Sequence, residues 1–175
     1  MEQSVEEMLV QDARRVGFSF ARYKFVAKMF DGMNLVMEVG HGNGVYTKVV
    51  EQAVNRVDTY DLPEFDITTD TSWGPYDGVY MLDVFEHIAP ELEYQMLDNL
   101  HACAPVCIIG TPSLRSQEYA SARSKQQHIN CKNGDDLKAS LRKHWRHVFM
   151  FGMNDETLHT GYFGMTHYLL AMCVK

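Results

Sequence analysis

The sequence lacks a surplus of basic charge. Its 175 residues carry 16 Lys and Arg against 23 Asp and Glu, which gives a net charge of -7. Binding to nucleic-acid phosphates requires a basic stripe that displaces counterions, and the basic clusters at residues 115–125 and 142–146 are too short to form one. We therefore expect both clusters to be solvated faces and the partner not to be a nucleic acid.

Cysteine is scarce, and long apolar runs are missing. The four cysteines form no C-x-x-C pair, and no two histidines and a carboxylate share a metal-ligand spacing. We therefore expect reduced core cysteines and no bound metal. No apolar stretch approaches the ~18 residues of a membrane span, and no basic segment leads into an apolar run near the N-terminus. The expectation is a cytoplasmic protein without membrane contact.

The chain is expected to form one domain over residues 1–175. Its hydrophobic content of 46% suffices for one core, and we find no linker, internal repeat or low-complexity tract. Helical spacing of apolar residues predicts helices at residues 2–16 and 19–30, separated at Gly17. Residues 1–32 would then form a lid or cap on a core of residues 33–175.

Strand and helix patterns alternate through residues 33–175. Short apolar runs predict strands at residues 35–39, 58–62, 78–82, 106–110, 147–153 and 167–174. Helices are expected at residues 45–54, from residue 90, and at residues 134–144. This alternation predicts an α/β domain with a mainly parallel sheet.

A glycine-rich segment, MEVGHGNG, joins the first predicted strand to the following helix. Such a loop lets the backbone approach a ligand closely and presents free N–H groups. Glu38 precedes the first glycine by two residues, Asp61 ends the next strand, and Asp83 follows a third. An acidic residue about 20 positions beyond the glycines is placed to accept hydrogen bonds from ribose hydroxyls. These features in this order predict a nucleotide-like cofactor.

The segments MEVGHGNG, TYDL and YDGVYMLDVFEHI resemble successive motifs of class I S-adenosylmethionine-dependent methyltransferases. The resemblance implies a Rossmann-like sandwich of strand order 3-2-1-4-5-7-6, whose last strand is antiparallel, and S-adenosylmethionine as cofactor. In ubiquinone-pathway O-methyltransferases an arginine placed like Arg22 binds the cofactor carboxylate; a solvated helix arginine is the alternative. The implied cofactor-binding residues are Arg22, Glu38, Gly40, His41, Gly42, Gly44, Asp61, Leu62, Leu82, Asp83 and His87.

The resemblance assigns each part of the cofactor to a part of this set. The three glycines would approach its methionine and ribose portions, and Asp61 would hold the ribose. Glu38 would bind the methionine ammonium directly or through water. Leu82, Asp83 and the start of the next helix would wall the sulfonium pocket, with His87 in a cofactor-pocket role.

The chain departs from the family pattern after Asp61. Only 16 residues separate Asp61 from Asp77, too few for a helix and an outer parallel strand. We therefore predict a sheet trimmed at that edge, a more open adenine site, and cofactor affinity that is weak or depends on a partner. Trp73 would stack on adenine or simply pack, and Asp66-Ile67 is the competing adenine contact.

The polar stretch after the strand at residues 106–110 supplies the catalytic candidates, because ligands bind at that end of open α/β sheets. His128 is the expected general base, since the pKa of histidine lies near neutrality, with a surface loop histidine as the alternative. Tyr119, Asn130 and Lys125 are its expected acceptor-binding neighbours. Two later residues, His159 and Tyr162, either reach across the site or belong to a plain connecting loop.

These features predict methyl transfer from S-adenosylmethionine to a hydroxyl or amine of a small acceptor. The segments GTPS, HINCKNGDDL and MNDETLHTG resemble methyltransferases encoded beside surface-polysaccharide genes, which implies a sugar or glycan precursor. The ubiquinone-type similarity implies a small phenol. The alternative is a noncatalytic module of the same fold that needs a partner, either another protein or a second copy. A dehydrogenase is disfavoured because its fingerprint is G-x-G-x-x-G.

Overall fold

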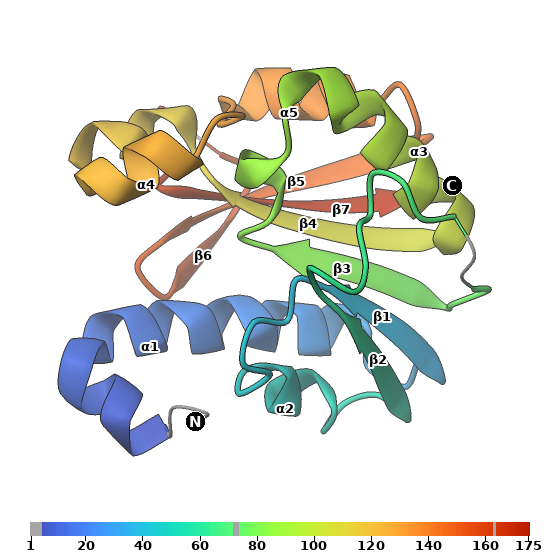
Figure 1. The fold of residues 1–175 in the computed structure, drawn as a ribbon, viewed down its shortest axis with the longest axis horizontal. Coiled ribbons are helices and arrows are strands. Elements are labelled where there is room, and N and C mark those ends of the chain that lie inside the picture. The colour runs from blue at the N-terminus through green and yellow to red at the C-terminus, as the bar shows by residue number, and fades with distance from the viewer. Residues whose placement is uncertain (1–4, 72–73, 163) are drawn as a thin grey trace.

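A seven-stranded mixed sheet forms the middle layer of the protein, with helices on both faces (Figure 1). The computed structural model describes residues 5–71, 74–162 and 164–175. The strands are β1 (Leu35–Val39), β2 (Arg56–Tyr60), β3 (Gly78–Leu82), β4 (Val106–Pro112), β5 (His147–Asn154), β6 (Thr157–Thr160) and β7 (Tyr168–Val174). The α-helices are α1 (Val5–Met29), α2 (Thr47–Val50), α3 (Glu93–Cys103), α4 (Ala122–Gln127) and α5 (Gly134–Leu141). Three short 3-10 helices are η1 (Phe85–His87), η2 (Pro90–Leu92) and η3 (Leu114–Tyr119).

The strand order is β2-β1-β3-β4-β7-β5-β6. Neighbours from β2 to β4 pair in parallel, whereas β7 runs antiparallel to both β4 and β5. This confirms the predicted mainly parallel sheet with an antiparallel last strand. The prediction of a plain loop after β5 was wrong, because β6 returns antiparallel along β5 as a hairpin. Asp155, with a φ of 50°, makes the tight turn between these two strands.

The edge of the sheet at β2 is trimmed as predicted. Within the described residues, β2 pairs only with β1, and residues 61–71 form two turns with no helix or strand. Phe65 and Ile67 in these turns are nonetheless buried in the core, at 9% and 3% exposure. The missing strand is thus replaced by a loop that still packs against the domain.

Alternating side chains of the central strands supply a core on each face of the sheet. Val36, Tyr80 and Ile108 belong to the cluster under α1 and α2. Met37, Met81 and Ile109 belong to the cluster shared with α3 and α5. Both faces of the parallel strands are covered, which explains their continuous apolar runs.

The N-terminal segment is one element with a break, at a different position from the predicted one. Asp12 has non-helical backbone angles, and its carboxylate accepts a hydrogen bond from the Arg15 N–H at 3.0 Å, as a helix cap does. Gly17 remains helical, so the predicted break there was wrong. After the glycine loop, α2 is only four residues long and residues 51–54 form turns, so the predicted helix at 45–54 was too long.

Across the described residues, no helix combines the length and the apolar character needed to cross a bilayer.

Candidate cofactor site

The glycine loop has a backbone that only glycine adopts easily. Gly40, Gly42 and Gly44 have φ values of 79°, 56° and 70°. A Cβ on Gly40 would lie 2.3 Å from Cγ2 of Val84, whereas a Cβ on Gly42 would meet nothing within 4 Å. The loop therefore packs tightly at Gly40 and leaves open space beside Gly42, which forms a cradle for a ligand.

The end of β2 and the residue that follows it hold this loop in place. The N–H of Gly40 donates to the carbonyl oxygen of Tyr60 at 2.7 Å, and the N–H of Gly42 donates to Oδ2 of Asp61 at 2.8 Å. Oδ1 of Asp61 accepts the N–H of Leu62 at 2.8 Å. Both carboxylate oxygens of Asp61 thus fix the conformation of the loop. Asp61 also lines one of the two cavities that meet at the loop.

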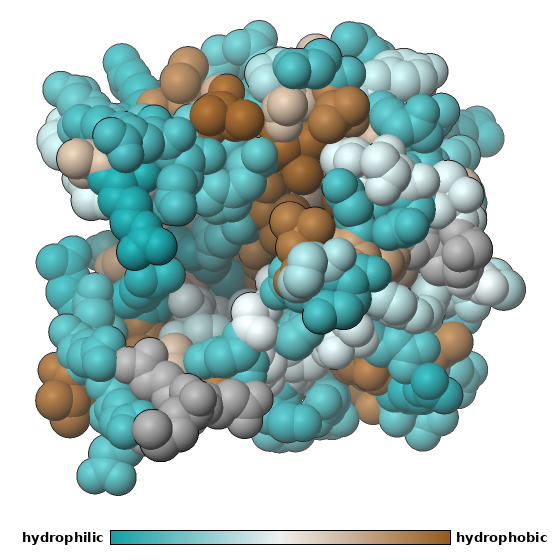
Figure 2. Space-filling view, in the orientation of Figure 1, coloured by the Kyte–Doolittle hydropathy of each residue, from teal (hydrophilic) through white to brown (hydrophobic). Residues whose placement is uncertain are grey.

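Two cavities of about 490 Å³ and 450 Å³ meet at the glycine loop, and each has the size of a small-molecule site. Gly40, Gly42 and Asp83 line both cavities. Figure 2 shows a face of the molecule that is hollowed near its middle, where apolar atoms lie within a polar surround. The first cavity, here the α1 cavity, is lined further by Met8, Gln11, Asp12, Arg15, Val16, Ser19, Tyr23, His41, Asn43, Tyr46 and Leu82. The second, here the β2 cavity, is lined further by Val39, Asp61, Leu62, Phe65, Asp66, Ile67, Val84, His87, Ile88 and Gln127.

Most of the predicted cofactor residues therefore come together around these cavities. His41 and Leu82 line the α1 cavity, and Asp61, Leu62 and His87 line the β2 cavity. The Nδ1 atom of His41 is buried without a hydrogen-bond partner. A buried polar atom without a partner is costly, so a ligand that bonds it would relieve that cost.

Arg22 does not line either cavity. Its Nη1 lies 2.8 Å from Oδ2 of Asp83, and its guanidinium lies 3.6 Å from the ring centroid of Tyr168. Burial, the largest single effect, lowers the pKa of Arg22, but the charge of Asp83, its hydrogen bond, and the nearby Tyr168 and Glu86 together raise the pKa above its ordinary value. Asp83 has a φ of 57°, an uncommon conformation for a residue other than glycine that is often found at functional sites. The arginine that lines the α1 cavity is Arg15.

Glu38 is buried below the glycine loop, at 1% exposure, and does not line a cavity. Three hydroxyls donate to its carboxylate: Tyr23 at 2.6 Å, Thr47 at 2.6 Å and Tyr80 at 2.8 Å. Burial raises the pKa of Glu38, while the hydroxyls oppose that shift. Its carboxylate is therefore engaged within the protein, and Tyr23 is the member of the network that faces the α1 cavity.

The β2 cavity keeps a wall on the side where the sheet is trimmed. Phe65, Asp66 and Ile67 line it, so the predicted adenine contact Asp66-Ile67 lies at the cavity. Asp66 also accepts hydrogen bonds from the N–H of Thr68 at 2.9 Å and from its hydroxyl at 2.7 Å, which shapes the turn. The other adenine candidate, Trp73, lies outside the described residues.

His128 does not line the β2 cavity itself, but it lies beside His87 and follows Gln127, both of which do. The ring centroids of His128 and His87 are 5.0 Å apart, and His87 Nδ1 lies 3.0 Å from the carbonyl oxygen of Gln127. Burial, together with His87, lowers the pKa of His128, so its imidazole is neutral near pH 7. Glu86 is buried beneath them, and its burial and the charge of Asp83 raise its pKa to about 8.

The other predicted acceptor-binding residues lie elsewhere. Tyr119 is 83% exposed and lines neither the α1 nor the β2 cavity, so the structure does not bring it to the candidate site. Lys125 donates to the carbonyl oxygen of Glu118 at 3.0 Å. Asn130 is buried and donates through Nδ2 to Oε2 of Glu93 at 3.0 Å, and its N–H donates to the carbonyl oxygen of Glu86 at 3.0 Å. Asn130 therefore anchors the segment that carries His128.

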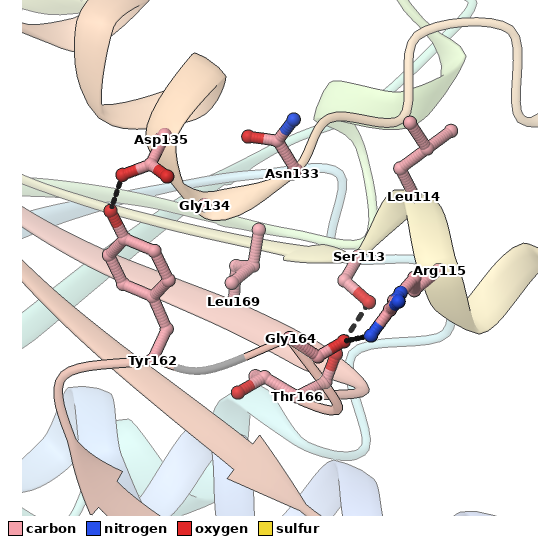
Figure 3. A pocket seen from close by; sticks show the side chains of 10 residues that line it. All are labelled: Ser113, Leu114, Arg115, Asn133, Gly134, Asp135, Tyr162, Gly164, Thr166 and Leu169. Atoms are coloured by element: carbon pink, nitrogen blue, oxygen red, sulfur yellow. Dashed lines mark hydrogen bonds between the residues drawn. The ribbon is translucent and has the colours of Figure 1, made fainter.

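A third cavity, of about 450 Å³, lies between the end of β4, the start of α5 and the segment before β7 (Figure 3). It shares no lining residue with the other two cavities. Its polar groups largely bond one another: Ser113 Oγ donates to the Thr166 carbonyl oxygen at 2.6 Å, Arg115 donates to the Gly164 carbonyl oxygen at 2.8 Å, and Tyr162 bonds Asp135. Tyr162 thus belongs to this cavity and not to the cofactor site, and His159 lies on β6.

Sequence reasoning missed several residues of the site. Arg15 and Tyr23 were assigned only to helices, and Glu86 was noted only as part of a motif. Helical spacing could have placed Arg15, Ser19 and Tyr23 on one face, because they are four residues apart. No local signal pairs Tyr80 with Glu38, since strand register decides that contact.

Comparison with known proteins finds no matching family model and no matching curated protein. Solved structures do match. A SAM-dependent methyltransferase from Archaeoglobus fulgidus aligns with a TM-score of 0.70 at 17% identity, over 93% of this chain and 94% of that one. The 1,6-didemethyltoxoflavin-N1-methyltransferase of Burkholderia thailandensis, solved with bound 1,6-didemethyltoxoflavin and S-adenosylhomocysteine, aligns with a TM-score of 0.69 at 15% identity, over 94% of this chain and 81% of that one.

A third match is to a complex from Haloferax volcanii between the Trm112 methyltransferase activator and a putative methyltransferase. It has a TM-score of 0.70 at 10% identity and covers 98% of both chains. At these identities the matches establish the architecture, which agrees with the resemblance of the sequence motifs. The chain has the fold of the class I S-adenosylmethionine-dependent methyltransferases.

Proposed function

We propose that this protein binds S-adenosylmethionine across the glycine loop and transfers its methyl group to a hydroxyl or amine of a small acceptor. The observation that carries the proposal is that two cavities meet at Gly40, Gly42 and Asp83. A cofactor with an amino-acid end and a nucleoside end requires such a pair of cavities, with its sulfonium at the junction. Methyltransferases of the same fold supply the precedent.

The α1 cavity suits the methionine end of the cofactor. Arg15 supplies a cation for the carboxylate, in place of Arg22, which is engaged with Asp83. Tyr23, which lines this cavity, donates its hydroxyl to Glu38 at 2.6 Å. Glu38 then acts on the ammonium group through Tyr23 or water and not by direct contact.

The β2 cavity suits the adenosine end. Asp61 offers carboxylate oxygens to ribose hydroxyls, while Phe65, Ile67 and Ile88 provide an apolar slot for the adenine ring. The wall is a loop and not a sheet strand, so cofactor affinity is expected to be weaker than in enzymes with a complete sheet edge.

His128 is the proposed general base. In the reaction, the acceptor oxygen or nitrogen bonds to the methyl carbon as the carbon–sulfur bond breaks, and S-adenosylhomocysteine leaves as the neutral thioether. The proton released by the acceptor passes to the neutral imidazole of His128, whose pKa is lowered by burial and by His87. Small sugars and glycan precursors are the first acceptors to test, with small phenols second.

A thermal-shift comparison of S-adenosylmethionine, S-adenosylhomocysteine and NAD tests the proposed cofactor. Stabilisation by both sulfur compounds, and not by NAD, is the expected result. Asp61→Ala should remove the shift, whereas Glu64→Ala, an exposed carboxylate three residues away, should retain it. Stabilisation by NAD alone would contradict the proposal.

Turnover separates the enzyme from the noncatalytic alternative. Transfer of a labelled methyl group to a sugar, amine or phenol panel, with formation of S-adenosylhomocysteine, supports the enzyme. Cofactor binding without transfer to any member, alone or with a partner protein, favours the binding module.

A further inference from the structure

The structure brings together three metal-binding side chains that are far apart in the sequence. Glu86 and His87 lie on η1, and His128 follows α4, 41 residues later. One potential ligand atom from each of the three lies within 4.8 Å of the others. We expected no metal because no potential ligands that are close in sequence have the spacing of a metal site. Such spacing cannot reveal a cluster whose members come from two distant segments.

The hydrogen bonds of both histidines leave the same nitrogen available. The carbonyl oxygen of Gln127 can only accept, so the 3.0 Å contact from His87 Nδ1 places the proton on Nδ1. Nδ1 of His128 likewise donates to Oε1 of Gln117 at 3.0 Å. Each ring therefore keeps a lone pair on Nε2. In a metal-binding histidine, the ring nitrogen that does not bind the metal usually donates a hydrogen bond of this kind, and that bond fixes the orientation of the ring.

The cluster is held by a rigid frame. The N–H of Asn130 donates to the Glu86 carbonyl oxygen at 3.0 Å, and the Thr111 hydroxyl donates to Oε2 of Glu86 at 3.0 Å. Glu86 is 1% exposed, while His87 is exposed to solvent. An ion can therefore enter from the His87 side and meet a buried carboxylate.

We propose that Glu86, His87 and His128 form a binding site for a divalent first-row transition metal ion, such as Mn²⁺, Co²⁺ or Zn²⁺. Two imidazole nitrogens and one carboxylate oxygen suit these ions better than Mg²⁺ or Ca²⁺, which prefer oxygen ligands throughout. Three protein ligands leave further coordination positions for water or for an acceptor oxygen.

The catalytic consequence rests on the proposed function, whereas metal binding itself does not. His87 lines the β2 cavity and Asp83 lines both cavities, so a bound ion would lie beside the proposed cofactor. There it would hold an acceptor hydroxyl and lower its pKa. Nε2 of His128 would then act as a metal ligand, and the ion would replace this residue as the group that activates the acceptor.

Titration of the metal-stripped full chain with Co²⁺, without S-adenosylmethionine, tests the site. We expect one Co²⁺ per chain, with the visible absorption bands of a nitrogen- and oxygen-ligated ion, and displacement by Zn²⁺. His87→Ala and His128→Ala should each weaken binding at least 10-fold. His147→Ala, which removes an exposed histidine on β5, should leave binding unchanged. Equal Co²⁺ binding by wild type and both ligand variants, or no stoichiometric binding, would overturn the proposal.

Two further measurements keep the outcome interpretable. Glu86→Gln removes the carboxylate ligand and should weaken Co²⁺ binding at least 10-fold. Gln117→Ala removes the hydrogen bond to His128 without removing a ligand, so it tests the site even if Glu86→Gln does not fold: several-fold weaker Co²⁺ binding supports the site, and unchanged binding contradicts it. A thermal shift with S-adenosylhomocysteine on the same samples separates the two proposals. Cofactor binding without metal binding rejects the metal site alone, and metal binding without cofactor binding rejects the proposed function alone.

Discussion

Arg22 and Asp83 form an ion pair that ties α1 to the end of β3, with Arg22 Nη1 2.8 Å from Oδ2 and 3.2 Å from Oδ1 of Asp83. The pair lies at the junction of the two cavities, because Asp83 lines both. Arg22 also covers the ring of Tyr168, at 3.6 Å from its centroid. The helix that walls the α1 cavity is thereby positioned relative to the glycine loop.

Loss of this pair should loosen α1. Arg22→Ala removes the stacking on Tyr168 and leaves Asp83 unpaired, and we expect the free energy of unfolding to fall by about 2 kcal/mol. Because 46% of the Asp83 side chain is exposed, the loss should be below that of a fully buried pair. Urea denaturation measures it, with Lys24→Ala as the control from an exposed position of the same helix. Equal effects of both substitutions would show that the pair does not stabilise the fold.

Gly40 and Gly32 provide a matched test of the glycine loop. Both have a φ of 79°, so alanine should cost about 1–2 kcal/mol at either position through backbone strain. A Cβ on Gly40 would also lie 2.3 Å from Val84 Cγ2, whereas Gly32 has no atom within 4 Å of that position. Gly40→Ala should therefore cost about 1–3 kcal/mol more by denaturant unfolding and also abolish cofactor binding. Adding Val84→Ala should recover part of the difference, and no recovery would argue against the clash.

The hydroxyls around Glu38 should differ in their effect on binding. Tyr80→Phe and Tyr23→Phe each remove one hydrogen bond to a buried carboxylate, and each should lower the free energy of unfolding by about 1.5–3 kcal/mol. Only Tyr23 lines the α1 cavity, so only Tyr23→Phe should also weaken S-adenosylhomocysteine binding in calorimetry. A larger loss of binding in Tyr80→Phe would contradict the proposed orientation of the cofactor.

The cysteines should react slowly with thiol reagents in the native protein. Burial raises the pKa of the Cys103 and Cys131 thiols to about 11 and that of Cys173 to about 12, and it raises the pKa of Cys107 well above its ordinary value. A thiol pKa raised from about 9 to about 11 leaves roughly 100-fold less thiolate at pH 8. Labelling with a chromogenic disulfide at pH 8 should be slow when folded and should reach four thiols per chain on unfolding. Rapid labelling of any thiol in the native protein would show that this cysteine is more exposed to solvent than it is in the structure.

The regular elements of the sheet were predictable because each has a strong local pattern. The strand at residues 78–82 was predicted with its observed bounds, since a continuous apolar run marks a strand that is covered on both faces. The order of Glu38, Gly40, Asp61 and Asp83 along the chain predicted that they lie near one another. Gly40, Asp61 and Asp83 line the cavities and Glu38 is buried below the loop, because the carboxyl ends of parallel strands lie at one edge of the sheet.

The remaining features depend on tertiary contacts that no pattern in the nearby sequence indicates. Gly17 is a weak helix former, but Asp12 caps the Arg15 N–H, and the break occurs there. The strand β6 is short and mostly exposed, so it has no apolar alternation that would reveal it. Glu86 and His128 meet where two hydrogen bonds join their segments, from the Asn130 N–H to the Glu86 carbonyl oxygen and from His87 Nδ1 to the Gln127 carbonyl oxygen. Tertiary packing decides each of these contacts.

A crystal structure with S-adenosylhomocysteine bound tests most directly whether one cofactor spans both cavities. We predict the amino-acid end in the α1 cavity near Arg15 and Tyr23, the ribose on Asp61, and the adenine ring between Phe65, Ile67 and Ile88. The sulfur would lie at the junction beside Gly40 and Asp83. Density for the ligand in any other cavity, or with its two ends exchanged, would contradict the proposed site.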